Sequence, residues 1–118
     1  MPVTVFGLKN CDSCRAARKY LDERDFQHAF RDIRDDGFSD NDLDAWLAAA
    51  GWEKLLNKNS KAWRELPHEA KADLGANEAR ALLKGNPILI KRPVIDAGRG
   101  VVTVGWDKSA RDVLRSVL

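Results

Sequence analysis

The Cys-x-x-Cys motif that runs from Cys11 to Cys14 constrains this chain more than any other feature, because it directly follows the first hydrophobic run. That run, residues 3–6, is rich in β-branched and aromatic side chains and ends at Gly7, which is typical of a buried strand. A cysteine at the start of the helix that follows lies in the positive field of unpaired backbone N–H groups. This field favours the thiolate, which is the nucleophilic form. We therefore predict that Cys11 is the reactive residue.

The residues on both sides of Cys11 fit a reactive helix start. Lys9 and Arg15 add positive charge beside the motif, and Asn10 is of a residue type that caps helices. The helix is expected to end near Asp25, so the motif lies where a strand gives way to an amphipathic helix. The inward face of this helix is predicted to consist of Cys14, Ala17, the aliphatic stem of Arg18, and Leu21.

The sequence leaves the role of Cys14 open. Three residues after Cys11, it falls on the apolar side of the predicted helix, where a buried cysteine acts as a small hydrophobic residue. A helix start also lets the two sulfurs of a Cys-x-x-Cys motif approach each other. Cys14 is therefore either a resolving thiol or an unreactive core residue.

A metal site is not predicted. Zinc sites use about four ligands, and the chain adds two histidines, His28 and His68, to its two cysteines at no recognised spacing. Both histidines are expected to be ordinary surface residues.

Strand and helix patterns alternate at the start of the chain and then give way to helices. Residues 28–34 alternate as a second strand, so strand, helix and strand predict a right-handed parallel βαβ unit. Helical patterns fill residues 38–85, where Ser39 and Asn77 are expected to cap two helices. The helix after Ser39 carries Trp46 on its apolar face, which predicts a core position for that ring. Further helical turns are predicted at residues 52–56, 62–66 and 67–75.

The last third of the chain returns to strand patterns. Residues 88–91 form an apolar run of strand character, and residues 94–96 and 101–104 are expected to pair as a hairpin. Asp107 is expected to cap a final helix. The predicted apolar face of that helix consists of Ala110, Val113, Leu114 and Val117.

The order of these elements predicts an α/β, thioredoxin-like fold. It reads β-α-β, then a helical block, then β-β-α, which gives a mixed four-stranded sheet with a helical insertion. A Cys-x-x-Cys motif near a βαβ pattern is an independent signature of the same fold. With 118 residues we expect a single domain over residues 1–118, with a core of residues 1–37 and 86–118 and an insertion of residues 38–85.

Charge and hydropathy exclude several classes of function. Twenty Lys and Arg residues against 18 Asp and Glu residues give a net charge of +2, and the signs alternate along the chain. A nucleic-acid binder normally has a strongly basic patch, so no nucleic-acid partner is expected. Neither a signal peptide nor a membrane-spanning run is evident, so no membrane partner is expected and the predicted location is the cytoplasm. In that reducing compartment, a Cys-x-x-Cys motif is more often redox-active or metal-binding than structural.

The dipeptide Arg92-Pro93 is the second candidate part of the site. It joins two predicted strands, and thioredoxin-like sites usually place a cis proline beside the nucleophilic cysteine. A cis X-Pro bond costs about 1 kcal/mol, so the sequence leaves both isomers of Pro93 open. Arg92 would then hold an anion near Cys11, since guanidinium offers paired donors to oxyanions. Further candidates for anion binding are Lys58, Lys61 and Arg64.

Three segments resemble the arsenate reductase (ArsC) family, and within it the short YffB-like subgroup. They are residues 5–14, residues 51–58 with 63–66, and residues 86–93, so the resemblance extends over essentially the whole chain. It implies a thioredoxin-like domain with a helical insertion, a nucleophile at Cys11 and an anion-binding Arg92 beside a cis Pro93. The candidate substrate- or glutathione-binding residues are Lys9, Asn10, Asn57, Lys58, Arg64 and Pro93.

The chain also departs from the arsenate-reducing members of this family. Those enzymes hold the oxyanion with three arginines, whereas this chain has Asn57 at the place of the first and Val104-Gly105-Trp106 near that of the third. Each lost donor of transition-state charge stabilisation often costs a few kcal/mol, so efficient arsenate reduction is not expected.

The resemblance implies two kinds of function. Members of the YffB-like subgroup are regarded as glutathione-dependent thiol reductases, and the related Spx regulators use the same motif as a redox switch and bind the RNA polymerase α subunit. We expect a glutathione-dependent thiol-disulfide oxidoreductase that acts as a monomer, with Cys11, Cys14 and Arg92 as catalytic residues. Glutathione is the expected co-substrate and no bound cofactor is expected. A small thiol, an oxyanion or glutaredoxin are the other expected partners. The alternatives are an Spx-like regulator and a weak arsenate reductase.

Overall fold

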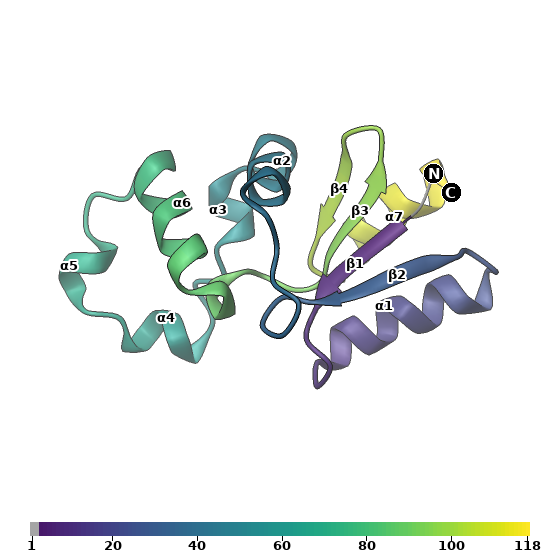
Figure 1. Cartoon of the computed structure of the whole chain (residues 1–118), viewed down its shortest axis with the longest axis horizontal. Helices are drawn as coiled ribbons and strands as arrows, with labels where there is room; N and C mark the ends of the chain where they lie inside the picture. The colour runs from purple at the N-terminus through teal and green to yellow at the C-terminus, as the bar shows by residue number, and fades with distance from the viewer. Residues whose placement is uncertain (1–2) are drawn as a thin grey trace.

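Four strands form one mixed sheet in residues 3–118, the part of the chain that this computed structural model describes (Figure 1). The central strand β1 (Val3–Gly7) runs parallel to β2 (His28–Asp32) and antiparallel to β3 (Val94–Gly98). Strand β4 (Val101–Val104) pairs with β3 as the predicted hairpin, which gives the order β2-β1-β3-β4. The predicted mixed sheet and thioredoxin-like fold are confirmed.

Helices α1 (Asp12–Glu23) and α7 (Lys108–Val117) cover one face of the sheet. Their buried residues pack with alternate strand residues such as Val5 and Ile95, because successive strand side chains point to opposite faces. The predicted inward face of α1 is confirmed at Cys14, Ala17 and Leu21, which are buried, whereas Arg18 is exposed.

Helix α7 confirms one part of its prediction and contradicts another. The Asp107 side chain accepts the Ala110 N–H at 2.9 Å, so the predicted cap is present. Ala110 and Leu114 are buried, but Val113 and Val117 are 39% and 47% exposed. The apolar face of α7 is therefore narrower than the sequence predicts, because the sheet covers one stripe of this outer helix.

The helical segment between β2 and β3 covers the other face of the sheet and extends beyond it (Figure 1). Its first helix begins with the predicted capping box, in which Ser39 and Asp42 exchange side chain to backbone bonds of 3.0 Å. No helix in residues 3–118 combines the length and apolar character needed to cross a bilayer. The helices of this segment are α2 (Asp40–Ala50), α3 (Trp52–Leu55), α4 (Lys61–Glu65), α5 (His68–Lys71) and α6 (Ala76–Gly85).

Helix α6 begins earlier than the sequence predicts. Asn77 was expected to be its cap, but Gly75 occupies that position. The Glu78 side chain accepts the Gly75 N–H at 3.0 Å, which places the N-cap two residues before Asn77.

Trp46 anchors the core between the sheet and the helical segment. Its side chain is fully buried, with the ring centroid 4.8 Å from that of Phe6 on β1 and 5.3 Å from that of Phe38. The predicted core position of Trp46 is confirmed. This contact joins α2 directly to the strand that leads to Cys11.

The prediction of a strand at residues 88–91 is wrong. Pro87–Leu89 form a short 3-10 helix, η1, and Ile90 makes an isolated antiparallel bridge to Leu56. The Lys91 N–H donates to the Leu55 carbonyl at 2.8 Å, so this backbone group bonds to the end of α3 and not to the sheet. The segment that leads to Arg92 is thereby tied to the helical insertion.

Candidate active site

Cys11 occupies the N-cap of α1, at the end of the loop that follows β1. Its backbone is extended and its carbonyl accepts the Arg15 N–H at 3.0 Å. We expected Asn10 to be the cap, but the helix begins one residue later and the Asn10 side chain is exposed. Within residues 3–118, the Cys11 side chain makes no capping bond to the helix. The sulfur is therefore placed at the positive end of α1, partly exposed.

Polar groups around Cys11 favour its thiolate. Ser13 Oγ lies 3.3 Å from Cys11 Sγ and can instead donate to the Arg92 carbonyl, 3.4 Å away. Burial by itself raises the pKa of the Cys11 thiol, but hydrogen bonds from the Cys14 thiol, the Ser13 hydroxyl and the Cys14 backbone, with the charge of Arg92, lower the pKa below its ordinary value. The net direction is downward because these groups stabilise the anion.

Cys14 is the protonated partner of the pair. Burial raises the pKa of its thiol to about 12, and its hydrogen bond with Cys11 acts in the same direction. Gly7 makes room for this sulfur, because a Cβ at that position would collide with Cys14 Sγ. Cys14 therefore keeps its proton and donates a hydrogen bond to the Cys11 sulfur. The buried core position that the sequence offered for Cys14 is confirmed, and its hydrogen bond to Cys11 is a contact that the sequence did not predict.

Arg92 lies just before β3, with its carbonyl 3.4 Å from Ser13 Oγ, and the Arg92-Pro93 bond is cis. Arg92 Nη1 donates to the Ile88 carbonyl at 3.0 Å and to the Ile90 carbonyl at 3.3 Å. Arg92 Nε is buried and has no hydrogen-bond partner in residues 3–118. A buried donor without a partner costs about 1–3 kcal/mol, which the oxygen of a bound anion would recover. The guanidinium is thus anchored through one group and has another left to bind an anion.

At two positions of this chain, the resemblance to arsenate-reducing enzymes would place further arginines. Both positions carry uncharged residues. The Asn57 side chain accepts the Asn59 N–H at 3.1 Å. Gly105 donates its N–H to the Pro93 carbonyl at 2.9 Å, with φ at +82°, a backbone conformation that favours glycine. Of the three positions, Arg92 alone supplies a cation.

The other cationic side chains that the sequence offered as binding residues interact with other residues of this chain. Lys9 Nζ is 3.0 Å from Asp35 Oδ2 in an exposed ion pair that raises the pKa of Lys9. Lys58 Nζ lies between two tryptophans, 5.6 Å and 5.8 Å from the ring centroids of Trp52 and Trp63. Two further cations also have other partners: Lys61 pairs with Glu65 at 3.6 Å, and Arg64 donates to the Asn59 carbonyl at 3.0 Å.

The structure thus gathers Cys11, Ser13, Cys14 and Arg92 at one place.

Two residues near the site were not identified from the sequence. Ser13 lies inside the motif, where its hydroxyl between two cysteines was a usable signal. Asp32 ends β2 and is buried, which is unusual for a carboxylate and could be found only from the register of β1 and β2.

The prediction that His28 is a surface residue is wrong: its side chain is only 7% exposed, with Nδ1 3.1 Å from the Phe26 carbonyl.

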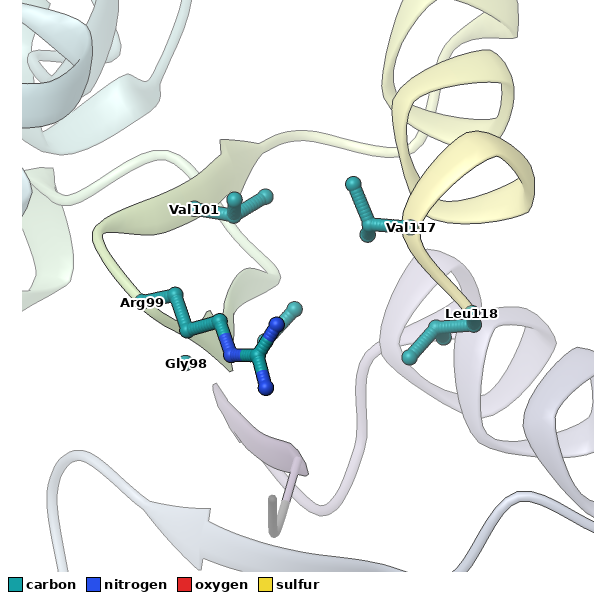
Figure 2. A pocket seen from close by; sticks show the side chains of 6 residues that line it. Gly98, Arg99, Val101, Val117 and Leu118 are labelled. Atoms are coloured by element: carbon teal, nitrogen blue, oxygen red, sulfur yellow. The ribbon is translucent and has the colours of Figure 1, made fainter.

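A cavity of about 400 Å³ lies at the far end of the molecule, between the tip of the β3–β4 hairpin and the end of α7 (Figure 2). Figure 2 shows the Arg99 side chain pointing from the hairpin into this cavity. None of its lining residues comes from the loop before Cys11 or from the segment around Arg92, so it is separate from the candidate site. The cavity is lined by Ala97, Gly98, Arg99, Val101, Val117 and Leu118.

Residues 3–118 contain no group of three His, Cys, Asp or Glu side chains that could hold a metal ion.

The two cysteines are expected to react at very different pH. The pKa of the Cys11 thiol lies below its ordinary value of 9.0, whereas that of Cys14 is raised to about 12. Because the thiolate is the reactive form, alkylation of Cys11 by iodoacetamide should reach half its maximal rate below pH 9, with Cys14 unmodified. Peptide mapping by mass spectrometry across this pH range measures both. Equal rates at the two cysteines would contradict the assignment.

Sequence comparisons identify relatives of this chain. The pattern of the ArsC family matches residues 6–112. An uncharacterized protein of Haemophilus influenzae is 41% identical over 93 residues, which cover 79% of this chain and 82% of that protein. The global transcriptional regulator Spx of Staphylococcus saprophyticus is 28% identical over 118 residues, covering 98% of this chain and 89% of the regulator.

A comparison of structures gives the same result. A solved YffB protein is 34% identical and superimposes with a TM-score of 0.86, covering 93% of this chain and 96% of its own. The resemblance that the segments around Cys11 and Arg92 predict is therefore confirmed over most of the chain. This chain belongs to the ArsC family.

Proposed function

We propose that this protein is a glutathione-dependent thiol-disulfide oxidoreductase that uses Cys11 as its nucleophile. The observation that carries the proposal is the Cys11 sulfur itself, which is partly exposed at the start of α1 and stabilised as a thiolate by Cys14, Ser13 and Arg92. Thiol-disulfide exchange needs an accessible sulfur with a high thiolate fraction. This site combines the two properties.

The reaction proceeds by two exchanges. The Cys11 thiolate attacks the glutathione sulfur of a mixed disulfide, so a Cys11–glutathione disulfide forms and the other thiol leaves as its thiolate. The thiolate of a second glutathione then attacks the glutathione sulfur on Cys11, which restores the Cys11 thiolate and releases oxidised glutathione. Each turnover oxidises one free glutathione, whose sulfur pairs with the glutathione taken from the substrate, and the substrate leaves as a free thiol. A pool of reduced glutathione is needed, and we therefore place the reaction in the cytoplasm.

Cys14 supports the first exchange and does not resolve the intermediate. A resolving thiol must lose its proton, and burial, the largest cause of the raised pKa of Cys14, still acts when Cys11 carries glutathione. Its proton instead stabilises the Cys11 thiolate before the attack. A second glutathione, which reaches the site from solvent, is therefore the better resolving thiol.

Arg92 orients glutathione in this proposal. Glutathione carries two carboxylates, and a guanidinium binds a carboxylate through charge-assisted hydrogen bonds. Arg92 Nε is buried without a partner in the described chain, whereas Nη1 is fixed by the Ile88 and Ile90 carbonyls. A single cation suits a carboxylate. Arsenate carries more charge, and the neutral Asn57 and Gly105 provide no cation for it.

The test is to incubate the purified protein with oxidised glutathione and map the adduct. We expect one glutathione on Cys11 and none on Cys14 by mass spectrometry of the peptides. The Cys14→Ala variant should still form the adduct, more slowly, because Cys11 loses a hydrogen bond that favours its thiolate. An unmodified Cys11 at a concentration that labels a free cysteine peptide would overturn the proposal.

A redox-switched regulator is a second candidate function, favoured by the 28% identity with Spx over the whole chain. In that case, Cys11 and Cys14 form a disulfide that changes the binding of a partner such as the RNA polymerase α subunit. A pull-down with the isolated α subunit, under oxidising and reducing conditions, tests this candidate. Lack of binding in both states would exclude it, whatever the result with glutathione.

A further inference from the structure

Asp32 is a buried carboxylate that binds backbone N–H groups from two different loops. It is 4% exposed, and its oxygens accept three backbone bonds. Oδ1 accepts from Arg34 at 2.8 Å and from Asp35 at 3.0 Å, both in the turn after β2. Oδ2 accepts from Lys9 at 3.1 Å, in the loop that leads to Cys11. One side chain therefore holds the β1–α1 loop and the β2–α2 turn together.

The register of the sheet explains this position. β1 and β2 are parallel, and Gly7 is the partner of Asp32, so both strands end at the same edge. The last backbone bond between them runs from the Ile33 N–H to the Gly7 carbonyl at 2.9 Å. Beyond it, the two chains separate, and the bond from Lys9 to Asp32 continues the connection. That bond is two residues from Cys11.

The turn after β2 has other bonds that do not involve the Asp32 carboxylate. Asp36 Oδ2 accepts the Asp32 N–H at 2.8 Å, and the Asp32 carbonyl accepts the N–H groups of Asp36 and Gly37 at 2.8 and 3.2 Å. The turn therefore has its own support. The distinct contribution of the carboxylate is its link to the loop of the reactive cysteine.

We propose that Asp32 is a positioning residue for Cys11, which fixes the Lys9 amide and thereby holds the sulfur at the start of α1 within reach of Ser13, Cys14 and Arg92. This inference rests on the proposed use of Cys11 as a nucleophile. Asp32 does not touch the substrate or the sulfur. It acts through the backbone of residues 9–11, where a small displacement lengthens the bonds that stabilise the thiolate.

The variant Asp32→Asn separates this role from the effect of charge. An amide has one oxygen, so if it continues to accept from Arg34 and Asp35, its NH₂ group faces the Lys9 N–H and that bond is lost. Loss of loop position raises the pKa of the Cys11 thiol. Removal of a nearby negative charge alone would lower it. The two explanations thus predict opposite signs.

The experiment compares Asp32→Asn with Asp36→Asn, a matched loss of one carboxylate from the same turn. Thiolate absorbance at 240 nm is followed against pH, and iodoacetamide alkylation of Cys11 is timed at pH 7 under conditions where urea curves show that each variant is folded. We expect Asp32→Asn to slow alkylation about five-fold and raise the thiol pKa, since tenfold in thiolate fraction corresponds to one pKa unit. Asp36→Asn should stay within about two-fold of wild type. Unchanged or faster alkylation of Asp32→Asn, or equal slowing by both variants, would overturn the proposal.

A second pair of variants covers the case in which Asp32→Asn does not fold. Both Lys9→Pro and Lys9→Ala remove the lysine side chain. Lys9→Pro also removes the backbone N–H that donates to Asp32, whereas Lys9→Ala retains this N–H. Slower alkylation of Lys9→Pro than of Lys9→Ala supports the proposal, and equal rates contradict it. Alkylation does not require glutathione. If wild-type Cys11 forms no glutathione adduct, the proposed function fails, while these comparisons still measure the role of Asp32.

Discussion

Replacing Cys11 with serine is expected to abolish glutathione-dependent disulfide reduction, with a loss on the order of a thousand-fold or more. A serine hydroxyl is almost fully protonated at neutral pH and forms no disulfide, so the first exchange cannot occur. The groups that stabilise the thiolate, Ser13, Cys14 and Arg92, cannot compensate for the missing sulfur. The rate is measured by NADPH oxidation coupled through glutathione reductase, with a glutathione mixed disulfide as substrate.

Cys14→Ala is the matched control for this loss. It removes the other thiol of the motif and leaves the nucleophile in place, so a slower but measurable rate is expected. If Cys11→Ser retained a rate comparable to wild type, the reductase activity would have to come from another group. If Cys14→Ala were as inactive as Cys11→Ser, Cys14 would be required for turnover, and resolution by a second glutathione would be wrong.

Local patterns predicted the parts of the fold that depend on neighbouring residues in the chain. The strand before Gly7, the parallel βαβ unit, the hairpin, the capping box at Ser39 and the helix cap at Asp107 are each determined by a few adjacent side chains. The position of Cys11 at the start of α1 belongs to the same class. Its pairing with Arg92 could be expected from the resemblance to the ArsC family, although these residues are far apart in the sequence.

Tertiary contacts decided the features that local patterns could not predict. Residues 88–91 have strand character, but the end of α3 offers the Leu55 carbonyl to Lys91, and the sheet is already complete without them. Asp32 has no local signal, because an aspartate at the end of a strand is normally exposed. Its partner Lys9 is 23 residues away and is brought to it by the parallel register.

The Arg92 guanidinium supports two parts of the proposed reaction. Its charge lowers the pKa of the Cys11 thiol, and its unpartnered Nε is the donor proposed for a glutathione carboxylate. A hydrogen bond to a charged group contributes about 1.5–3 kcal/mol, which corresponds to a factor of roughly 10 to 100 in binding. Loss of Arg92 should therefore weaken glutathione binding and also reduce the thiolate fraction.

Arg92→Ala is expected to raise the KM for the glutathione mixed disulfide about 10- to 100-fold. It should also raise the pH at which Cys11 is half alkylated, because a cation beside the thiolate is lost. Arg92→Lys should recover part of the pH shift but little of the KM, since an ammonium restores the charge without the planar donors of guanidinium. Arg115→Ala, which removes an exposed arginine of α7, controls for net charge and should change neither quantity. An unchanged KM in Arg92→Ala, with the pH shift present, would mean that Arg92 acts on the sulfur alone and that another group binds glutathione.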